Sequence, residues 1–329
     1  MKKIIPIVAF CLICAVGFLR LNDIFVEKYI NRCYMLAEHL ETIEDIDVQV
    51  FGSCHAYTSF NSLYFEEKYA ISSYNMAFPS EILPVTYMRM YERFKVDTPK
   101  VALVEIWGIN AYETYIPTEQ LLDDYMRPNV ENLPFSLEKL ELIEDFETLD
   151  PLEDNFAVLK YKDRLLDFSL NELDFDYSFE KANEMYNADG SDYYYNEMLL
   201  RFANNGYKPY EANPLTEYER IQGYVYPFDK LAPEEIIQKY LEKIIALCEE
   251  NNVTLIFYRA PYLSTENELR KANWMEEYLG AKGIPFYDVE EALEWDYDSD
   301  FIDYEHLSIN GAYKVTDYLG EIIVNEMNK

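Results

Sequence analysis

The fold of this chain starts from the stretch Ile46-Asp47-Val48-Gln49-Val50-Phe51-Gly52-Ser53-Cys54-His55. The alternating run that ends at Phe51 predicts a short strand. Gly52 permits a tight turn, and residues 55–66 are expected to continue as a helix or turn. The first turn of a helix has free N–H groups that stabilise an anion. This arrangement is therefore typical of a strand that presents a nucleophile at its carboxyl end.

Four more segments predict strands, and each is followed by a helix or a turn. These strands are residues 69–76, 101–107, 253–258 and 284–288. Residues 101–107 are nearly all apolar, as in a strand that is buried on both faces of a parallel sheet. Helices are expected at residues 81–94, 233–250, 266–279 and 308–328. The alternation predicts an α/β fold, with a doubly wound, mainly parallel five-stranded sheet flanked by helices.

The N-terminus differs from the rest of the chain. Lys2 and Lys3 precede an uncharged apolar run over residues 4–19. The run is short for a membrane span of about 20 residues, but apolar residues resume just beyond it. We predict a membrane anchor at residues 1–23, followed by a connecting helix at 24–45.

A cleaved signal peptide is the alternative interpretation, with Ala15-Val16-Gly17 as a small-x-small cleavage site. A lipoprotein is disfavoured, because Ile13 stands before Cys14 where a small residue is expected. All three interpretations export the rest of the chain, since positive residues stay on the inner side.

Residues 46–329 are predicted to form one domain, with a helical and Tyr-rich insertion at about 113–230. Acidic helices are expected at 136–147 and 152–168. The chain has 31 tyrosines, and the insertion is predicted to cap the site. Its aromatic faces suit a platform for sugar rings, or alternatively an amphipathic surface packed on the core.

The composition excludes several function classes. The formal net charge is −33, from 28 basic and 61 acidic residues. So acidic a surface disfavours a nucleic-acid partner, because phosphate binding needs a basic footprint. No metal-ligand spacing and no phosphate-binding Gly motif occurs, so no metal and no cofactor is expected.

One of the three histidines stands in a pattern that suits catalysis. His306 follows Asp303 by three residues, so the carboxylate can accept from one ring nitrogen and leave the other free. A general base for a nucleophile needs this orientation. The alternative is a histidine that caps a surface turn. His39, in the N-terminal helix, is expected to be incidental.

The nucleophile turn and the Asp-x-x-His turn together resemble the SGNH (GDSL-type) hydrolase family. Its first block, Gly-Asp-Ser, corresponds to Gly52-Ser53-Cys54. Its second block, an oxyanion-hole Gly, corresponds to Ser80. Its third, Gly-x-Asn-Asp, corresponds to Gly108-Ile109-Asn110, with Ala111 in place of the last residue. Its fifth block corresponds to Asp303-Tyr304-Glu305-His306. The blocks span both ends of the catalytic fold and leave the middle uncovered.

The resemblance implies a flavodoxin-like three-layer sandwich with a catalytic triad. Cys54 would be the nucleophile, His306 the base and Asp303 the residue that holds it. The N–H groups of Cys54 and Ser80 and the side chain of Asn110 would form the oxyanion hole. The form Gly-Ser-Cys-His and the N-terminal anchor look most like the anchored extracellular members, which include the D-alanyl-lipoteichoic-acid synthesis protein and polysaccharide O-acylation enzymes.

Two departures from the family pattern matter. Cys54 stands in place of Ser, and a thiolate is the better nucleophile and forms a thioester. Ser53 as the attacking group, or a degenerate site that only binds, are the alternatives. Ser80 stands in place of Gly, which a backbone N–H tolerates if the conformation is allowed.

Four further residues are expected near the pocket: Ser53, His55, Trp107 and Arg259. His55 either tunes the pocket or packs locally. Arg259 follows a buried strand and pairs either with an anionic polymer or with a nearby carboxylate. Asn110 either donates to the oxyanion or caps a turn.

The resemblance therefore predicts an esterase or acyltransferase that acts on O-acyl esters of a cell-envelope polysaccharide or teichoic-acid-like glycopolymer. A membrane-bound O-acyltransferase is the implied protein partner. The alternative function is a non-catalytic binding partner of such an acyltransferase, using the same cleft. A thiol protease fits less well, because nothing in the sequence indicates a peptide groove. Fold-level analogy alone does not assign the substrate.

Overall fold

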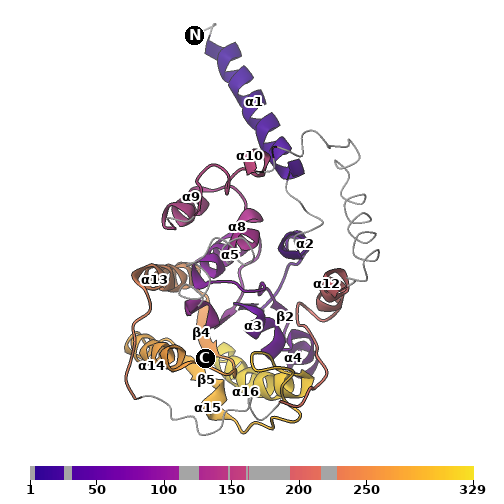
Figure 1. Cartoon of the computed structure of the whole chain (residues 1–329), viewed down its shortest axis with the longest axis vertical. Helices are drawn as coiled ribbons and strands as arrows, with labels where there is room; N and C mark the ends of the chain where they lie inside the picture. The colour runs from indigo at the N-terminus through magenta and orange to yellow at the C-terminus, as the bar shows by residue number, and fades with distance from the viewer. Residues whose placement is uncertain are drawn as a thin grey trace.

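The five predicted strands form one sheet, and the predicted fold class is confirmed. The computed structural model describes residues 4–25, 32–110, 126–146, 149–160, 162, 193–215 and 228–329. The strands are β1 (Val48–Phe51), β2 (Ser73–Asn75), β3 (Val101–Glu105), β4 (Thr254–Arg259) and β5 (Phe286–Asp288). Their order is β2-β1-β3-β4-β5 and all neighbours are parallel (Figure 1). This is the flavodoxin-like order.

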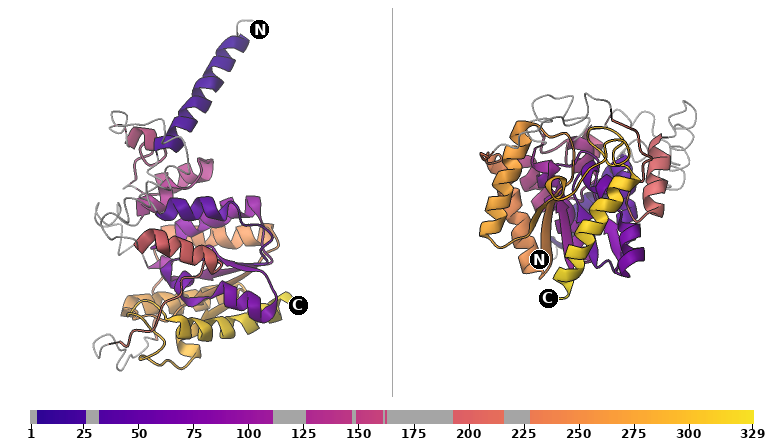
Figure 2. Two further views of the ribbon diagram at one scale, coloured as in Figure 1. Left: turned by 90° about the vertical axis from the view of Figure 1, so that its right-hand side faces the viewer. Right: turned by 90° about the horizontal axis from the view of Figure 1, so that it is seen from below.

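Helices cover both faces of the sheet and complete three layers (Figure 2). On one face lie α3 (Cys54–Ser59), α4 (Ser62–Tyr69) and α16 (Ile309–Met327). On the other face lie α2 (Arg32–Leu40), α5 (Leu83–Val96), α13 (Glu235–Glu250) and α14 (Glu266–Ala281). Short elements η1 (Trp107–Ile109) and α15 (Val289–Ala292) follow β3 and β5.

The apolar run of β3 explains why the sheet is buried on both faces. Val101 and Leu103 pack in the core with α16, whereas Ala102 and Val104 pack in the core with α5 and α13. All four side chains are fully buried. Burial of a large apolar side chain contributes roughly 1.5–3 kcal/mol, so this central strand anchors both layers.

The described part of the insertion combines helices with extended segments. It contains α8 (Arg127–Glu131), α9 (Leu137–Glu144), α10 (Ala157–Lys160) and α12 (Tyr193–Ala203). The predicted helix 136–147 is confirmed as α9. The predicted helix 152–168 is found only at α10, and most of its second half lies outside the described residues.

Residues 204–215, which we name the strap, follow α12 and run along the edge of the domain. The Asn75 N–H donates to the Asn205 carbonyl (2.8 Å), so the strap begins beside β2. The Lys208 N–H then donates to the Tyr57 carbonyl of α3 (2.8 Å). The strap ends where the Asn213 N–H donates to the Phe301 carbonyl (3.0 Å), so it ties three parts of the fold together.

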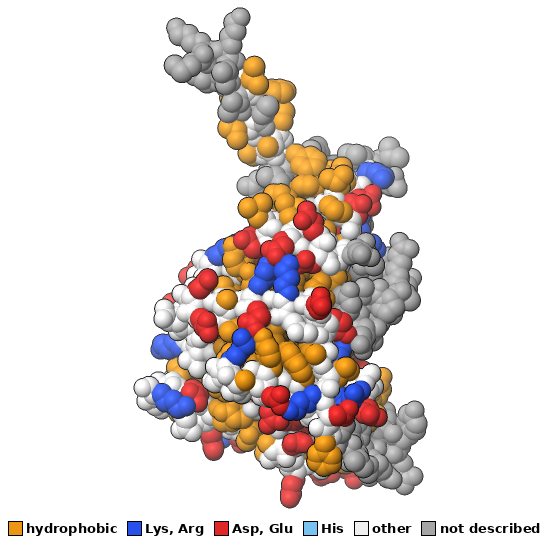
Figure 3. Space-filling model, turned by 90° about the vertical axis from the view of Figure 1, so that its left-hand side faces the viewer, with side chains coloured by type: hydrophobic (Ala, Val, Ile, Leu, Met, Phe, Trp, Pro, Cys, Tyr) orange, Lys and Arg blue, Asp and Glu red, His pale blue; other side chains and the backbone are white. Residues whose placement is uncertain are grey.

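Helix α1 (Ile4–Phe25) projects away from the domain (Figures 1 and 3). Its exposed large apolar side chains include Ile7, Phe10, Leu12, Ile13 and Val16. Within the described ranges, no helix combines the length and the apolarity that crossing a membrane would need. The predicted connecting helix 24–45 corresponds in part to α2, and residues 26–31 lie outside the described ranges.

Candidate active site

The turn after β1 places Cys54 at the start of a helix. Gly52 has a φ of 133°, and a Cβ there would lie 3.0 Å from the Glu105 Cβ, so the turn requires glycine. Ser53 is the N-cap of α3, and its hydroxyl accepts from the His55 N–H (3.3 Å). Cys54 is the first residue of the helix, where N–H groups have no intrahelical acceptor. Its thiol is partly exposed.

The turn before α16 presents His306 in the predicted way. His306 Nδ1 lies 3.1 Å from each Asp303 carboxylate oxygen. The N–H groups of Glu305 and His306 also donate to Asp303 Oδ1, each at 2.8 Å. Burial acts to raise the pKa of Asp303, but these bonds and the His306 charge lower it from its usual value. Asp303 is therefore a charged group that fixes the orientation of the ring.

Cys54 and His306, which are far apart in sequence, meet at the carboxyl end of the sheet. Burial acts to lower the pKa of His306. The pKa is nevertheless raised to about 10, by the charge of Cys54 and then by the hydrogen bonds to Asp303 and Cys54 and the charge of Asp303. Because Nδ1 faces Asp303, the other ring nitrogen is left for the sulfur. The raised pKa keeps His306 protonated at neutral pH, so an imidazolium lies beside the sulfur of Cys54.

Ser80 lies in a turn whose backbone suits glycine. Its φ is 53°, in the left-handed region. A Cβ on Gly108 would come within 2.8 Å of the Glu81 carbonyl oxygen, so the turn packs directly against the segment that leads to Asn110. This is a conformation that glycine adopts at no steric cost.

Side chains beneath this turn hold it in place. Glu81 accepts from Thr86 Oγ1 (2.9 Å) and from Arg89 Nε (3.1 Å). Asn129 Nδ2, at the start of the insertion, donates to the Pro79 carbonyl (2.8 Å). The conformation of Ser80 is therefore imposed by its surroundings, including a part of the insertion.

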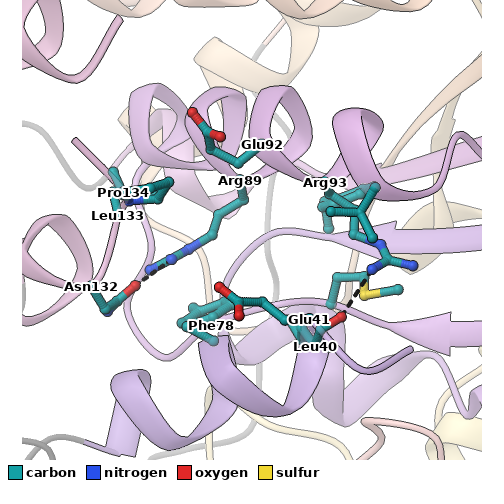
Figure 4. Close-up of a pocket in the computed structure, with 13 residues that line it drawn as sticks. Leu40, Glu41, Phe78, Arg89, Glu92, Arg93, Asn132, Leu133 and Pro134 are labelled. Atoms are coloured by element: carbon teal, nitrogen blue, oxygen red, sulfur yellow. Dashed lines mark hydrogen bonds between the residues drawn. The ribbon is translucent and has the colours of Figure 1, made fainter. Parts of the chain in front are cut away.

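A pocket of about 350 Å³ lies behind the same turn (Figure 4). Arg89 reaches across it from α5 to the side chain of Asn132, and its guanidinium stacks 3.6 Å from the centre of the Phe78 ring. Neither Cys54 nor His306 lines this pocket. Its wall includes Arg89, which supports the Ser80 turn through Glu81.

Replacement of Ser80 by glycine is expected to preserve both folding and any activity at Cys54. Glycine relieves a left-handed strain of about 1–2 kcal/mol, but it adds entropy to the unfolded chain worth about 0.5–1 kcal/mol. The urea midpoint should therefore change little. Ser80→Val should lower it, because a β-branched side chain is strained at positive φ. Equal midpoints for the glycine and valine variants would contradict this account of the turn.

Asn110 is the C-cap of η1 and is 5% exposed. Its Nδ2 donates to the Tyr262 hydroxyl (3.1 Å), and its Oδ1 is buried without a partner among the described residues. A 180° rotation of the amide would exchange these atoms and offer N–H groups in place of the oxygen. The Asn110 amide can therefore present either its oxygen or its N–H groups on the unpartnered side.

His55 is buried at the centre of an aromatic cluster. Its ring stacks against Trp107 (centroids 5.0 Å apart) and His306 (5.4 Å), and it contacts Tyr262 (4.7 Å). Burial and then the charge of His306 hold the pKa of His55 well below 6.5, so the ring is neutral. Its Nδ1 lies 3.8 Å from Cys54 Sγ. His55 thus lies beside Cys54, and Trp107 packs against the His55 ring.

Glu105 is a site residue that the sequence reasoning missed. It ends β3 and is 1% exposed. Its Oε2 accepts from the Ser53 hydroxyl (3.2 Å), and its Oε1 accepts from the Trp107 N–H (2.9 Å). Burial raises its pKa to about 8, against the opposing effects of these hydrogen bonds and of Arg259. The signal in the sequence was a lone carboxylate inside an otherwise apolar strand.

Two predicted roles are corrected or limited by the structure. Arg259 does not lie at a rim where it could meet a polymer: it is 1% exposed and pairs with Asp288 (2.9 Å) and Glu290 (2.6 Å). Tyr207, from the Tyr-rich section, is fully buried and so offers no sugar platform. The side chains of residues 193–195 lie outside the described part of the structure.

Neither a scan against protein-family models nor a search of curated proteins finds a match for this chain. The resemblance to the SGNH hydrolases therefore stays a prediction from the short sequence blocks.

Proposed function

We propose that this chain is an exported esterase or O-acyltransferase that acts on O-acyl esters of a cell-envelope glycopolymer. The observation that carries the proposal is the meeting of Cys54, His306 and Asp303 at the carboxyl end of a parallel sheet. Ligands of doubly wound folds bind at this end. The sequence blocks support the polymer class, and an anchor at residues 1–23 with a membrane-bound O-acyltransferase as partner belongs to the same proposal.

In the proposed reaction the Cys54 thiolate attacks the acyl carbonyl, and a C–S bond forms. The oxyanion of the tetrahedral intermediate accepts from the N–H groups of Cys54 and Ser80 and from the Asn110 amide. Collapse of this intermediate breaks the C–O bond, and protonated His306 gives its proton to the leaving alkoxide. A thioester remains on Cys54.

The second half of the reaction regenerates the enzyme. Neutral His306 takes a proton from water or from a sugar hydroxyl, which attacks the thioester carbonyl. Collapse returns the thiolate and the imidazolium, and releases an acid or a new ester. Asp303 keeps His306 in one orientation through both halves. Water as acceptor gives an esterase, and a sugar hydroxyl gives an acyltransferase.

Alkylation of Cys54 tests the proposal. The full chain, with Cys11 and Cys14 of the N-terminal run replaced by serine, is expected to hydrolyse 4-nitrophenyl acetate. Iodoacetamide should abolish this hydrolysis in step with modification of Cys54, followed by peptide mass spectrometry. Cys33 and Cys248 are buried, and burial, followed by the charge of Glu249, raises the pKa of Cys248 to about 12, so both should react slowly. Full alkylation of Cys54 with undiminished hydrolysis would refute the proposal.

A further inference from the structure

A buried hydrogen-bond chain runs beneath the nucleophile. Glu105 Oε2 lies 3.2 Å from Ser53 Oγ, and Ser53 Oγ lies 3.1 Å from His55 Nδ1. All three residues are at most 1% exposed. The far nitrogen of the ring, His55 Nε2, is buried and has no partner among the described residues. The proposed chemistry at Cys54 gives none of these three side chains a role.

The Ser53 hydroxyl has one proton to donate and two lone pairs that accept. One lone pair is used by the His55 backbone N–H, which donates to it at 3.3 Å. Two proton arrangements then allow both hydrogen bonds that join Glu105, Ser53 and His55 Nδ1. They differ in whether Glu105 carries a proton.

With Glu105 ionised, the Ser53 hydroxyl donates to Glu105 Oε2, and His55 Nδ1–H donates to Ser53 Oγ. The same Nδ1–H faces Cys54 Sγ, 3.8 Å away, so it also stabilises a thiolate. Nε2 then carries a lone pair.

With Glu105 protonated, the order reverses. Glu105 Oε1 already accepts from the Trp107 N–H at 2.9 Å, so the acid proton belongs on Oε2 and points to Ser53. Ser53 then donates to His55 Nδ1, and the ring proton moves to Nε2. One proton is taken up from solvent by the Glu105–Ser53–His55 group. It neutralises the Glu105 carboxylate, and the His55 ring stays neutral in both arrangements.

We propose that Glu105 and Ser53 are positioning residues that decide which nitrogen of His55 carries its proton, and through it how strongly Cys54 Sγ is hydrogen-bonded. When Glu105 is protonated, His55 does not donate an N–H to the sulfur, and its ring proton lies on Nε2, which has no partner among the described residues. When Glu105 is ionised, His55 donates to the sulfur and makes the thiolate a weaker nucleophile. This consequence at Cys54 rests on the proposed function, whereas the change of tautomer does not.

The surroundings of Glu105 agree with a change near neutral pH. Burial raises the pKa of Glu105 to about 8, so the carboxyl is mostly protonated at pH 7. The other groups that face it are Arg259 and Tyr258 on β4, Tyr262 beyond it, and neutral His55. Burial holds the pKa of both tyrosines well above 10, and Arg259 is paired with carboxylates, so none of these facing groups titrates near neutral pH together with Glu105.

The test is a ¹⁵N NMR titration of the full chain labelled at its three histidines. His55 should show an Nε2–H ring at pH 6 and an Nδ1–H ring at pH 9.5, with the exchange centred near the pKa of Glu105, about 8. In Glu105→Gln the amide donates permanently to Ser53, so the ring should stay Nε2–H throughout. Glu81→Gln is the matched control. Burial likewise raises the pKa of Glu81, to about 7, but Glu81 is hydrogen-bonded to Thr86 and Arg89 and not to Ser53 or His55. This variant should keep the wild-type exchange.

One tautomer over the whole range in the wild-type protein would overturn the inference, and this needs no variant to fold. An unchanged exchange in Glu105→Gln would overturn it too. The spectra need no substrate, so an inactive protein with the expected exchange contradicts only the proposed function. If the protein is active, the rate of hydrolysis by the wild type should change near pH 8 as Glu105 titrates, and this change should be absent in Glu105→Gln. A purely structural role of Glu105 would lower the rate equally at every pH.

Discussion

Cys54→Ala is expected to lower the hydrolysis of an aryl acetate by a factor on the order of 10³ or more. Alanine removes the sulfur that forms the acyl-enzyme, and the members of such a site act as a unit. Cys54→Ser should retain part of the activity, because His306 and Asp303 remain in place and a hydroxyl paired with a histidine is still a nucleophile. The measurement is the steady-state rate of 4-nitrophenol release for the three proteins.

His306→Ala gives an independent control on the same substrate. Loss of the group that moves the proton should cost about 10²–10⁴-fold, without loss of the fold. Ser53→Ala separates the two adjacent candidates for nucleophile. It should keep turnover, although it removes the N-cap of α3, which costs about 1 kcal/mol of stability. An inactive Ser53→Ala beside an active Cys54→Ala would move the nucleophile to Ser53.

Gly206→Ala is expected to be the most destabilising change in the strap, by about 3 kcal/mol or more. Its φ is +80°, and an added Cβ would lie 2.0 Å from the Asn75 carbonyl oxygen. Neither backbone can yield easily, because the Asn75 N–H donates to the Asn205 carbonyl (2.8 Å) and the Gly206 N–H donates to the Arg201 carbonyl (2.7 Å). The measurement is the free energy of unfolding in urea.

Gly283→Ala is the matched control for this prediction. Gly283 also has a positive φ, +72°, but an added Cβ would have no neighbour within 4 Å. It therefore isolates the conformational cost, about 1–2 kcal/mol, from the cost of the clash. Equal losses in the two variants would show that the strap is not packed tightly on the edge of β2.

The sheet could be predicted from the sequence because its central strands are short runs of apolar residues. β3 and β4 are runs of apolar residues, and both proved to be buried on both faces. Strand ends were less predictable: residues 69–76 were expected as a strand, but only Ser73–Asn75 pair. The C-terminal turn of α4 takes the first part of that segment, and Ala70 ends it in the left-handed conformation.

The site could be predicted only where a few consecutive residues determine the local backbone conformation. The turns around Cys54 and His306 are local, so their residues could be named from sequence. Glu105, Tyr262 and Asn129 act through contacts between segments that are distant in the chain. For Arg259 the sequence left either an anionic polymer or a carboxylate as partner, and the structure shows carboxylates, Asp288 and Glu290, about 30 residues further along the chain. Pairings of this kind follow from the packed fold and not from spacing.

The most direct test of the central claim is the intact mass of the protein after brief mixing with 4-nitrophenyl acetate and quenching in acid. The wild type and Cys54→Ser should each gain one acetyl group, mapped by peptide analysis to residue 54, and Cys54→Ala should gain none. Acetylation of Cys54→Ala at the wild-type level, or a wild-type protein that never carries an acetyl group at Cys54, would contradict the account. The chain would then be better regarded as a non-catalytic partner of an acyltransferase.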